Sequence, residues 1–117
     1  MEGQGIIDPK IYNELKELMG ADYVVEIIDT YIQETEGLIQ QLPQALGAGD
    51  AATFGRLAHS IKSSSASLGA VNFSLQAREL EMLGKANDLA GVGAKLEKLT
   101  AAFLLVASRL KELRDEP

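Results

Sequence analysis

The last quarter of the chain carries a regular spacing of apolar residues that is typical of a packed helix. Between residues 92 and 114, the apolar side chains recur at alternating intervals of three and four, at Leu96, Leu99, Phe103, Val106, Leu110 and Leu113. This spacing places all of them on one side of an α-helix. A helix of this kind needs other helices to cover its apolar side, so the pattern predicts a helical bundle.

Four further segments show the start and stop signals of helices. We expect a short helix from Pro9 to Met19 and longer helices over residues 22–46, 50–69 and 72–87. The connections are short, which favours antiparallel neighbours, and no segment shows sustained strand alternation. The sequence therefore predicts an all-α fold, an antiparallel up-down four-helix bundle with a short additional N-terminal helix. We expect one domain over residues 1–117, with a flexible N-terminus at 1–7 and the bundle at 8–114.

Two local features of this bundle can be predicted in more detail. Pro43 lies late in the second helix, where it would clash with the carbonyl of Ile39, so we expect a kink or an early break there. In the short first helix, the apolar residues are spaced for one buried face, at Ile11, Leu15, Leu18 and Met19. Ahead of it, Ile6 and Ile7 are expected to tuck onto the bundle.

The composition excludes several classes of function. The 117 residues contain no Cys and one His, so disulfides, thiolate chemistry and a transition-metal site are not expected. The net charge of −6 argues against nucleic-acid binding, which needs a basic face. No apolar run reaches the roughly 18 residues of a membrane span, and no signal peptide is visible at the N-terminus, so we expect a cytoplasmic protein.

The only histidine, His59, lies in the segment FGRLAHSIKSSSASLG, residues 54–69. The apolar stripe of this segment runs through Phe54, Leu57, Ala58, Ile61, Ser65 and Leu68. His59 lies beside the stripe, so we expect its imidazole on the solvent side of the helix. Lys62 lies one turn further along, on the same side.

The stretch HSIKSSSASLGA resembles the signature of histidine phosphotransfer (HPt) domains. The matching positions are His59, Ile61, Lys62, Ser64, Ser65, Leu68, Gly69 and Ala70. Ser63 departs from the signature, because the family usually has glycine there. We expect this serine to narrow the choice of partner or weaken docking without abolishing transfer. The resemblance implies a four-helix bundle in which His59 is the phosphoacceptor.

Two side chains are expected to assist His59. Counting equal distances from the turn near Gly69 brings Glu81 of the next helix close to His59, where its carboxylate can fix the imidazole tautomer. The alternative is a solvated Glu81 paired with Arg78 or Lys85. Lys62 is expected to neutralise charge on the incoming phosphoryl group, the alternative being a merely exposed lysine. Gly69 is expected to cap the helix and to keep the hairpin tight.

A docking surface is expected around His59. The candidates on its own helix and on the next one are Arg56, Ser60, Ser63, Ala66, Leu75, Arg78 and Met82. Exposed apolar residues beside polar ones are typical of a partner site. For Leu75 and Met82, the alternative is plain packing against another helix.

The resemblance implies a phosphocarrier that shuttles a phosphoryl group between aspartates of receiver domains in a two-component phosphorelay. Its expected partners are these receivers and a sensor histidine kinase, with no nucleic acid and no membrane, and it would act as a monomer. No ATP-binding motif is visible, so we expect neither kinase activity nor a cofactor, and Mg²⁺ would belong to the receiver. Two alternatives stay open, the phosphoacceptor domain of a chemotaxis-type histidine kinase and a receiver-binding module without transfer.

Overall fold

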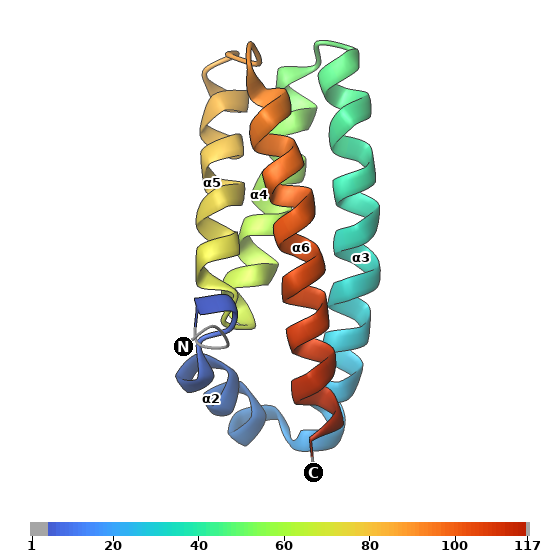
Figure 1. Ribbon diagram of the computed structural model, residues 1–117, viewed down its shortest axis with the longest axis vertical. Coiled ribbons are helices and arrows are strands. Elements are labelled where there is room, and N and C mark those ends of the chain that lie inside the picture. The colour runs from blue at the N-terminus through green and yellow to red at the C-terminus, as the bar shows by residue number, and fades with distance from the viewer. Residues whose placement is uncertain (1–4, 117) are drawn as a thin grey trace.

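The computed structural model describes residues 5–116, in which the main elements are five helices and no strand occurs (Figure 1). Their bounds are Pro9–Met19 for α2, Ala21–Gly47 for α3, Ala51–Ser67 for α4, Val71–Lys85 for α5 and Val92–Asp115 for α6. Helices α3 to α6 run up and down beside one another, and α2 lies across the lower end (Figure 1). The predicted all-α bundle with a short N-terminal helix is confirmed, and α6 extends one residue beyond the expected end.

Local capping explains why the helices begin and end where they do. Asp8 accepts a hydrogen bond from the Lys10 amide at 2.9 Å, and Asp50 accepts one from the Thr53 amide at 3.1 Å. Both are N-caps that satisfy an otherwise unpaired amide of the first turn. At the other end of α4, the amide of Ala70 donates to the carbonyl of Ser65 at 3.0 Å, which closes a Schellman motif.

The core lies along the centre of the bundle and consists of aliphatic residues with five aromatic rings, those of Tyr12, Tyr31, Phe54, Phe73 and Phe103. The fully buried large side chains include Phe54, Ile61, Leu80 and Leu99. Phe103 contacts the rings of Tyr31 and Phe73, with centroids 6.3 and 5.8 Å apart. Leu113 is only partly buried, while the other residues of the predicted α6 stripe lie in this core, so the spacing identified the inner face.

The buried face of α2 differs from the prediction. Leu18 is 81% exposed and Met19 is 41% exposed, whereas Tyr12 is buried. Ile11 and Leu15 are half-buried. The helix lies across the end of the bundle and covers it with its first turns only, so apolar spacing alone did not reveal which turns make contact.

Of the kink or early break expected at Pro43, the early break is wrong, because α3 continues through this residue to Gly47. Pro43 is exposed and stands about one turn before the helix end. A proline there removes only one intrahelical hydrogen bond, and the packing of Leu42 and Ala45 in the core holds the last turn in place.

Residues 5–7 are the part of the predicted flexible N-terminus that the structure describes. Gly5 and Ile6 are helical, and Ile7 is only 2% exposed. The expectation that Ile6 and Ile7 tuck onto the bundle is confirmed, since Ile7 lies in the core and the half-buried Ile6 packs against it. The remainder of the predicted flexible N-terminus, residues 1–4, lies outside the described residues, as does Pro117.

Within residues 5–116, none of the helices is long and apolar enough to cross a membrane.

Candidate functional site

The site is built on the pair of helices α4 and α5, which approach each other through two glycines. An added Cβ on Gly84 would stand 2.8 Å from the Cα of Gly55, so position 84 has no room for a side chain, whereas a Cβ on Gly55 would lie 3.7 Å from Gly84, in ordinary van der Waals contact. Further along, the Ser74 hydroxyl donates to the carbonyl of Lys62 at 2.9 Å. These contacts fix the spacing and register of the two helices, and therefore the side chains that face each other between them.

His59 of α4 and Glu81 of α5 face each other at this interface, as the sequence predicted. Nδ1 of His59 lies 2.7 Å from Oε2 of Glu81. The side chain of His59 is 57% exposed, while that of Glu81 is 2% exposed. An imidazole open to solvent is thus held from behind by a buried carboxylate.

The Glu81 carboxylate has two cations as further partners. Nζ of Lys62 lies 2.7 Å from Oε1, and Nζ of Lys85 lies 3.3 Å from Oε2. The Lys62 hydrogen bond is the largest influence on the pKa of Glu81. Burial acts in the opposite direction, but hydrogen bonds from His59 and Lys85 add to the effect, and the pKa falls to about 2. Glu81 is therefore ionised at any physiological pH.

This ionisation determines the tautomer of the neutral imidazole. A carboxylate can only accept hydrogen bonds, so Nδ1 of His59 must carry the proton that it shares with Oε2. In neutral His59, the lone pair therefore lies on Nε2, the other ring nitrogen. The site can thus present a nucleophilic nitrogen to a partner in solution.

The geometry contradicts the two alternatives given for Lys62 and Glu81, an exposed lysine and a solvated carboxylate. Lys62 is half-buried and bound to Glu81, so it is not the free exposed lysine of the alternative. Glu81 does pair with Lys85, but it is buried rather than a solvated surface charge. Lys85 joins the site as well, and the sequence signal for it is its position four residues after Glu81 on the same helix.

The predicted docking residues all lie on the surface. Those on α4 are Arg56, Ser60, Ser63 and Ala66, and those on α5 are Leu75, Arg78 and Met82. Leu75 and Met82 are each 54% exposed, so neither packs inside the bundle. A pocket of about 360 Å³ beside His59 is lined by Gly55 and Gly84 and bordered by Arg56 and Lys85.

Gly69 is a structural residue at the turn between α4 and α5. Its φ is +93°, and an added Cβ would stand 3.0 Å from the backbone oxygen of Asp8. The carbonyl of Gly69 accepts a hydrogen bond from the amide of Asp8 at 2.8 Å. The expected cap is present, and in addition the glycine lets the start of α2 lie directly on the turn.

Within residues 5–116, no group of three or more His, Cys, Asp or Glu side chains is placed to hold a metal ion. The hydrogen bond that holds His59 joins one imidazole to one carboxylate, that of Glu81.

Comparison with known proteins gives matches over most of the chain. Residues 26–116 match the Hpt domain family. The chain is 26% identical over 96 residues to the phosphorelay protein LuxU of Vibrio harveyi, an alignment that covers 82% of this chain and 84% of that protein. It also resembles the crystal structure of histidine-containing phosphotransfer protein B (HptB) from Pseudomonas aeruginosa PAO1. That comparison gives a TM-score of 0.87 at 31% identity and covers 93% of this chain and 94% of the other.

Proposed function

The chain belongs to the Hpt domain family of histidine phosphotransfer proteins, and on that premise we propose that His59 is the residue that carries the phosphoryl group. His59 would accept the group from the aspartyl phosphate of one receiver domain and pass it to the aspartate of another. The observation that supports this assignment is the 2.7 Å contact between Nδ1 of His59 and the buried carboxylate of Glu81.

The transfer step follows from the tautomer. Nε2 of His59 uses its lone pair to form a bond to phosphorus, and the bond between phosphorus and the aspartyl oxygen breaks. The electron pair of that bond stays on the leaving carboxylate of the receiver. Glu81 keeps the Nδ1 proton in place and stabilises the positive charge that develops on the ring. The reverse of the same step delivers the group to the second receiver.

Lys62 and Lys85 would supply positive charge to the phosphoryl group. Phosphoryl transfer depends mainly on positioning and charge stabilisation, so few protein groups are needed. Both ammonium groups contact Glu81 and lie beside His59, and Lys85 is 67% exposed, which leaves it accessible to an incoming group. We assign Lys62 the main role, because its shorter contact holds it in place.

The surface around His59 is suited to a receiver. The active site of a receiver carries an acceptor aspartate, and the residues that border His59 include the cations Arg56 and Lys85. Opposite charges on the two surfaces favour encounter and orientation. Leu75 and Met82 would add apolar contact, and the Mg²⁺ that the reaction requires would be held by the receiver.

A transfer assay tests this proposal. Receiver domains that carry radiolabelled aspartyl phosphate are mixed with wild type and with His59→Gln, and the label is followed. We expect label that is labile to acid and stable to base on wild type only. His59→Gln should melt within a few degrees of wild type, since the side chain is exposed. Label on a folded His59→Gln protein, or none on wild type, would contradict the assignment.

A second experiment distinguishes transfer between receivers from direct phosphorylation by a kinase. A kinase core supplied with ATP and no receiver domain is offered the wild-type protein. Efficient labelling under these conditions would favour a phosphoacceptor domain of a kinase over a receiver-to-receiver carrier.

A further inference from the structure

The side of α6 that faces away from the bundle carries an exposed apolar patch. Leu104 is 68% exposed and Leu105 is 59% exposed. About one turn before and after them, the small residues Ala101 and Ser108 are exposed as well. Helix α6 packs mainly on α3 and α5 and lies in front of α4 in Figure 1. The patch therefore lies diagonally across the bundle from the helix that carries His59.

Leu104 has charges of opposite sign at equal distances along the helix. Glu97 lies seven residues before it, and Lys111 lies seven residues after it. Seven residues bring a side chain back to nearly the same face of a helix, so the three form one row. Both charged side chains are exposed, and neither has an ion-pair partner within residues 5–116. The row is therefore complementary in charge to its own reverse.

Leu105 repeats the pattern with the signs exchanged. Lys98 lies seven residues before it, and Glu112 lies seven residues after it, both of them exposed. Glu112 contacts Arg109 of its own helix at 3.6 Å, while Lys98 has no ion-pair partner in the part of the chain that the structure describes. This second row is also complementary to its own reverse.

Two copies of α6 bring both rows together when the helices lie antiparallel about a twofold axis between Leu104 and Leu105. At a rise of 1.5 Å per residue, Glu97 of one copy then lies within about 1.5 Å of the height of Lys111 of the other copy. Lys98 and Glu112 match in the same way along the other row. The two small residues of the patch lie opposite each other, which allows the helices to approach closely. A twofold contact uses the same surface on both copies, and this surface meets that condition.

We propose that a second copy of this chain binds the outer face of α6 as this antiparallel twofold pair. Four ion pairs would border the contact, two between Glu97 and Lys111 and two between Lys98 and Glu112. A parallel pair would instead place equal charges opposite each other, so the charges select the antiparallel arrangement. The dimer replaces the monomer that the family resemblance implied. Because α4 lies across the bundle from α6, both copies of His59 would stay accessible.

Sedimentation equilibrium of the full chain tests this proposal. One helix face per copy makes a small interface, so for wild type we expect the average mass to rise with concentration from one chain towards two. Glu97→Lys should weaken association about tenfold, because each dimer would then hold two pairs of facing lysines. The same change brings the net charge of −6 closer to zero, so a general fall in repulsion would have the opposite effect. Glu97→Lys combined with Lys111→Glu should restore association, because every pair is formed again with its signs exchanged.

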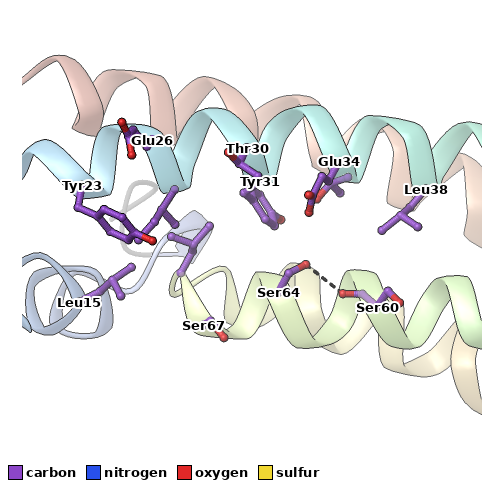
Figure 2. A pocket seen from close by; sticks show the side chains of 13 residues that line it. Leu15, Tyr23, Glu26, Thr30, Tyr31, Glu34, Leu38, Ser60, Ser64 and Ser67 are labelled. Carbon is purple, nitrogen blue, oxygen red and sulfur yellow. Dashed lines mark hydrogen bonds between the residues drawn. The ribbon is translucent and has the colours of Figure 1, made fainter. Parts of the chain in front are cut away.

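Glu34→Lys is the matched control, because it makes the same change in charge on another face. Figure 2 shows Glu34 on α3, in the groove between α3 and α4, whose volume is about 570 Å³. Association of this variant should be no weaker than that of wild type. Leu104→Gln removes apolar contact near the axis and should weaken association. All the changed side chains are exposed, so thermal unfolding should show that each variant keeps the fold.

Four results would overturn the dimer. They are a wild-type protein that stays a monomer at every concentration, unchanged association of Leu104→Gln, a loss for Glu34→Lys equal to that for Glu97→Lys, and an exchanged double variant that associates no better than Glu97→Lys. Transfer of label to His59 should be the same in all these variants. The dimer and the phosphoryl carrier can therefore fail separately.

Discussion

Gly84 of α5 lies so close to Gly55 of α4 that a Cβ at position 84 would stand 2.8 Å from both the nitrogen and the Cα of Gly55. Gly84 is three residues from Glu81, and Gly55 is four residues from His59. One helical turn from this contact, the two functional side chains meet. The close approach of the backbones therefore sets the distance across which His59 and Glu81 interact.

We expect Gly84→Ala to destabilise the bundle by about 1–3 kcal/mol, because the methyl group must push the two backbones apart. The same displacement should slow transfer by lengthening the contact between His59 and Glu81. Urea unfolding and the transfer assay measure the two effects. Gly37→Ala is the matched control, since nothing lies within 4 Å of a Cβ there and α3 should gain about 0.5–1 kcal/mol. Equal stability of the two variants would show that α4 and α5 can separate at no cost.

Lys62→Ala should both weaken the fold and slow transfer. The variant leaves the buried Glu81 carboxylate without its main partner, at a cost of about 2 kcal/mol for one charge-assisted hydrogen bond. A loss of about 1.4 kcal/mol in the transition state would slow transfer about tenfold. Denaturant unfolding and transfer rates test both effects, with the exposed Lys98→Ala as control, for which we expect a change within about 0.5 kcal/mol. Transfer at the wild-type rate would remove Lys62 from the mechanism.

The low pKa of Glu81 predicts a specific dependence of stability on pH. Its pKa is about 2 in the folded chain, against an ordinary value of 4.5. Between these two values, the unfolded chain binds a proton that the folded chain does not, so stability falls as the pH is lowered through this window. Above about pH 5 the contribution is fully present.

Urea unfolding at pH 6 and pH 3 tests this dependence. We expect wild type to lose more stability between the two values than Glu81→Gln, which has no carboxyl group to titrate at this position. The other carboxylates are common to both proteins and serve as the internal control. Parallel losses in the two proteins would mean that Glu81 titrates normally.

Gly69→Ala should cost about 1–3 kcal/mol, because alanine is strained at a φ of +93° and its Cβ would press on the Asp8 carbonyl. Gly93→Ala, in the first turn of α6 with nothing within 4 Å of its Cβ, should be neutral or stabilising. Thermal unfolding of the two variants measures the difference. A Gly69→Ala protein as stable as wild type would show that the start of α2 does not depend on this turn.

The bundle and the contact between His59 and Glu81 could be predicted from the sequence, because both follow from local regularities. Apolar spacing defined the helices, and equal counting from the turn at Gly69 paired the two side chains. The sharing of one carboxylate by Lys62 and Lys85 could not be predicted in the same way. It depends on side-chain rotamers and on how deeply Glu81 is buried, which the spacing does not reveal.

The position of α2 and the presence of a groove between α3 and α4 could not be predicted from sequence patterns, for a different reason. The exposure of Leu18 depends on where a short helix crosses the end of the bundle. The groove depends on the separation of two helices whose facing residues include Ser60 and Ser64. Small polar residues within a helix are compatible with close packing as well as with an open cleft, so only the assembled structure distinguishes the two.

The hydrogen bond between Asp8 and Gly69 has a consequence for the order of folding. Helices α4 and α5 are neighbours in the sequence, so their hairpin closes only a short loop. The start of α2 instead binds the turn at Gly69, which exists only after this hairpin has formed. The whole of α3 separates α2 from the hairpin in the sequence. We therefore expect α2 to dock late, and its amides to exchange with solvent through a local opening that leaves the rest of the bundle intact.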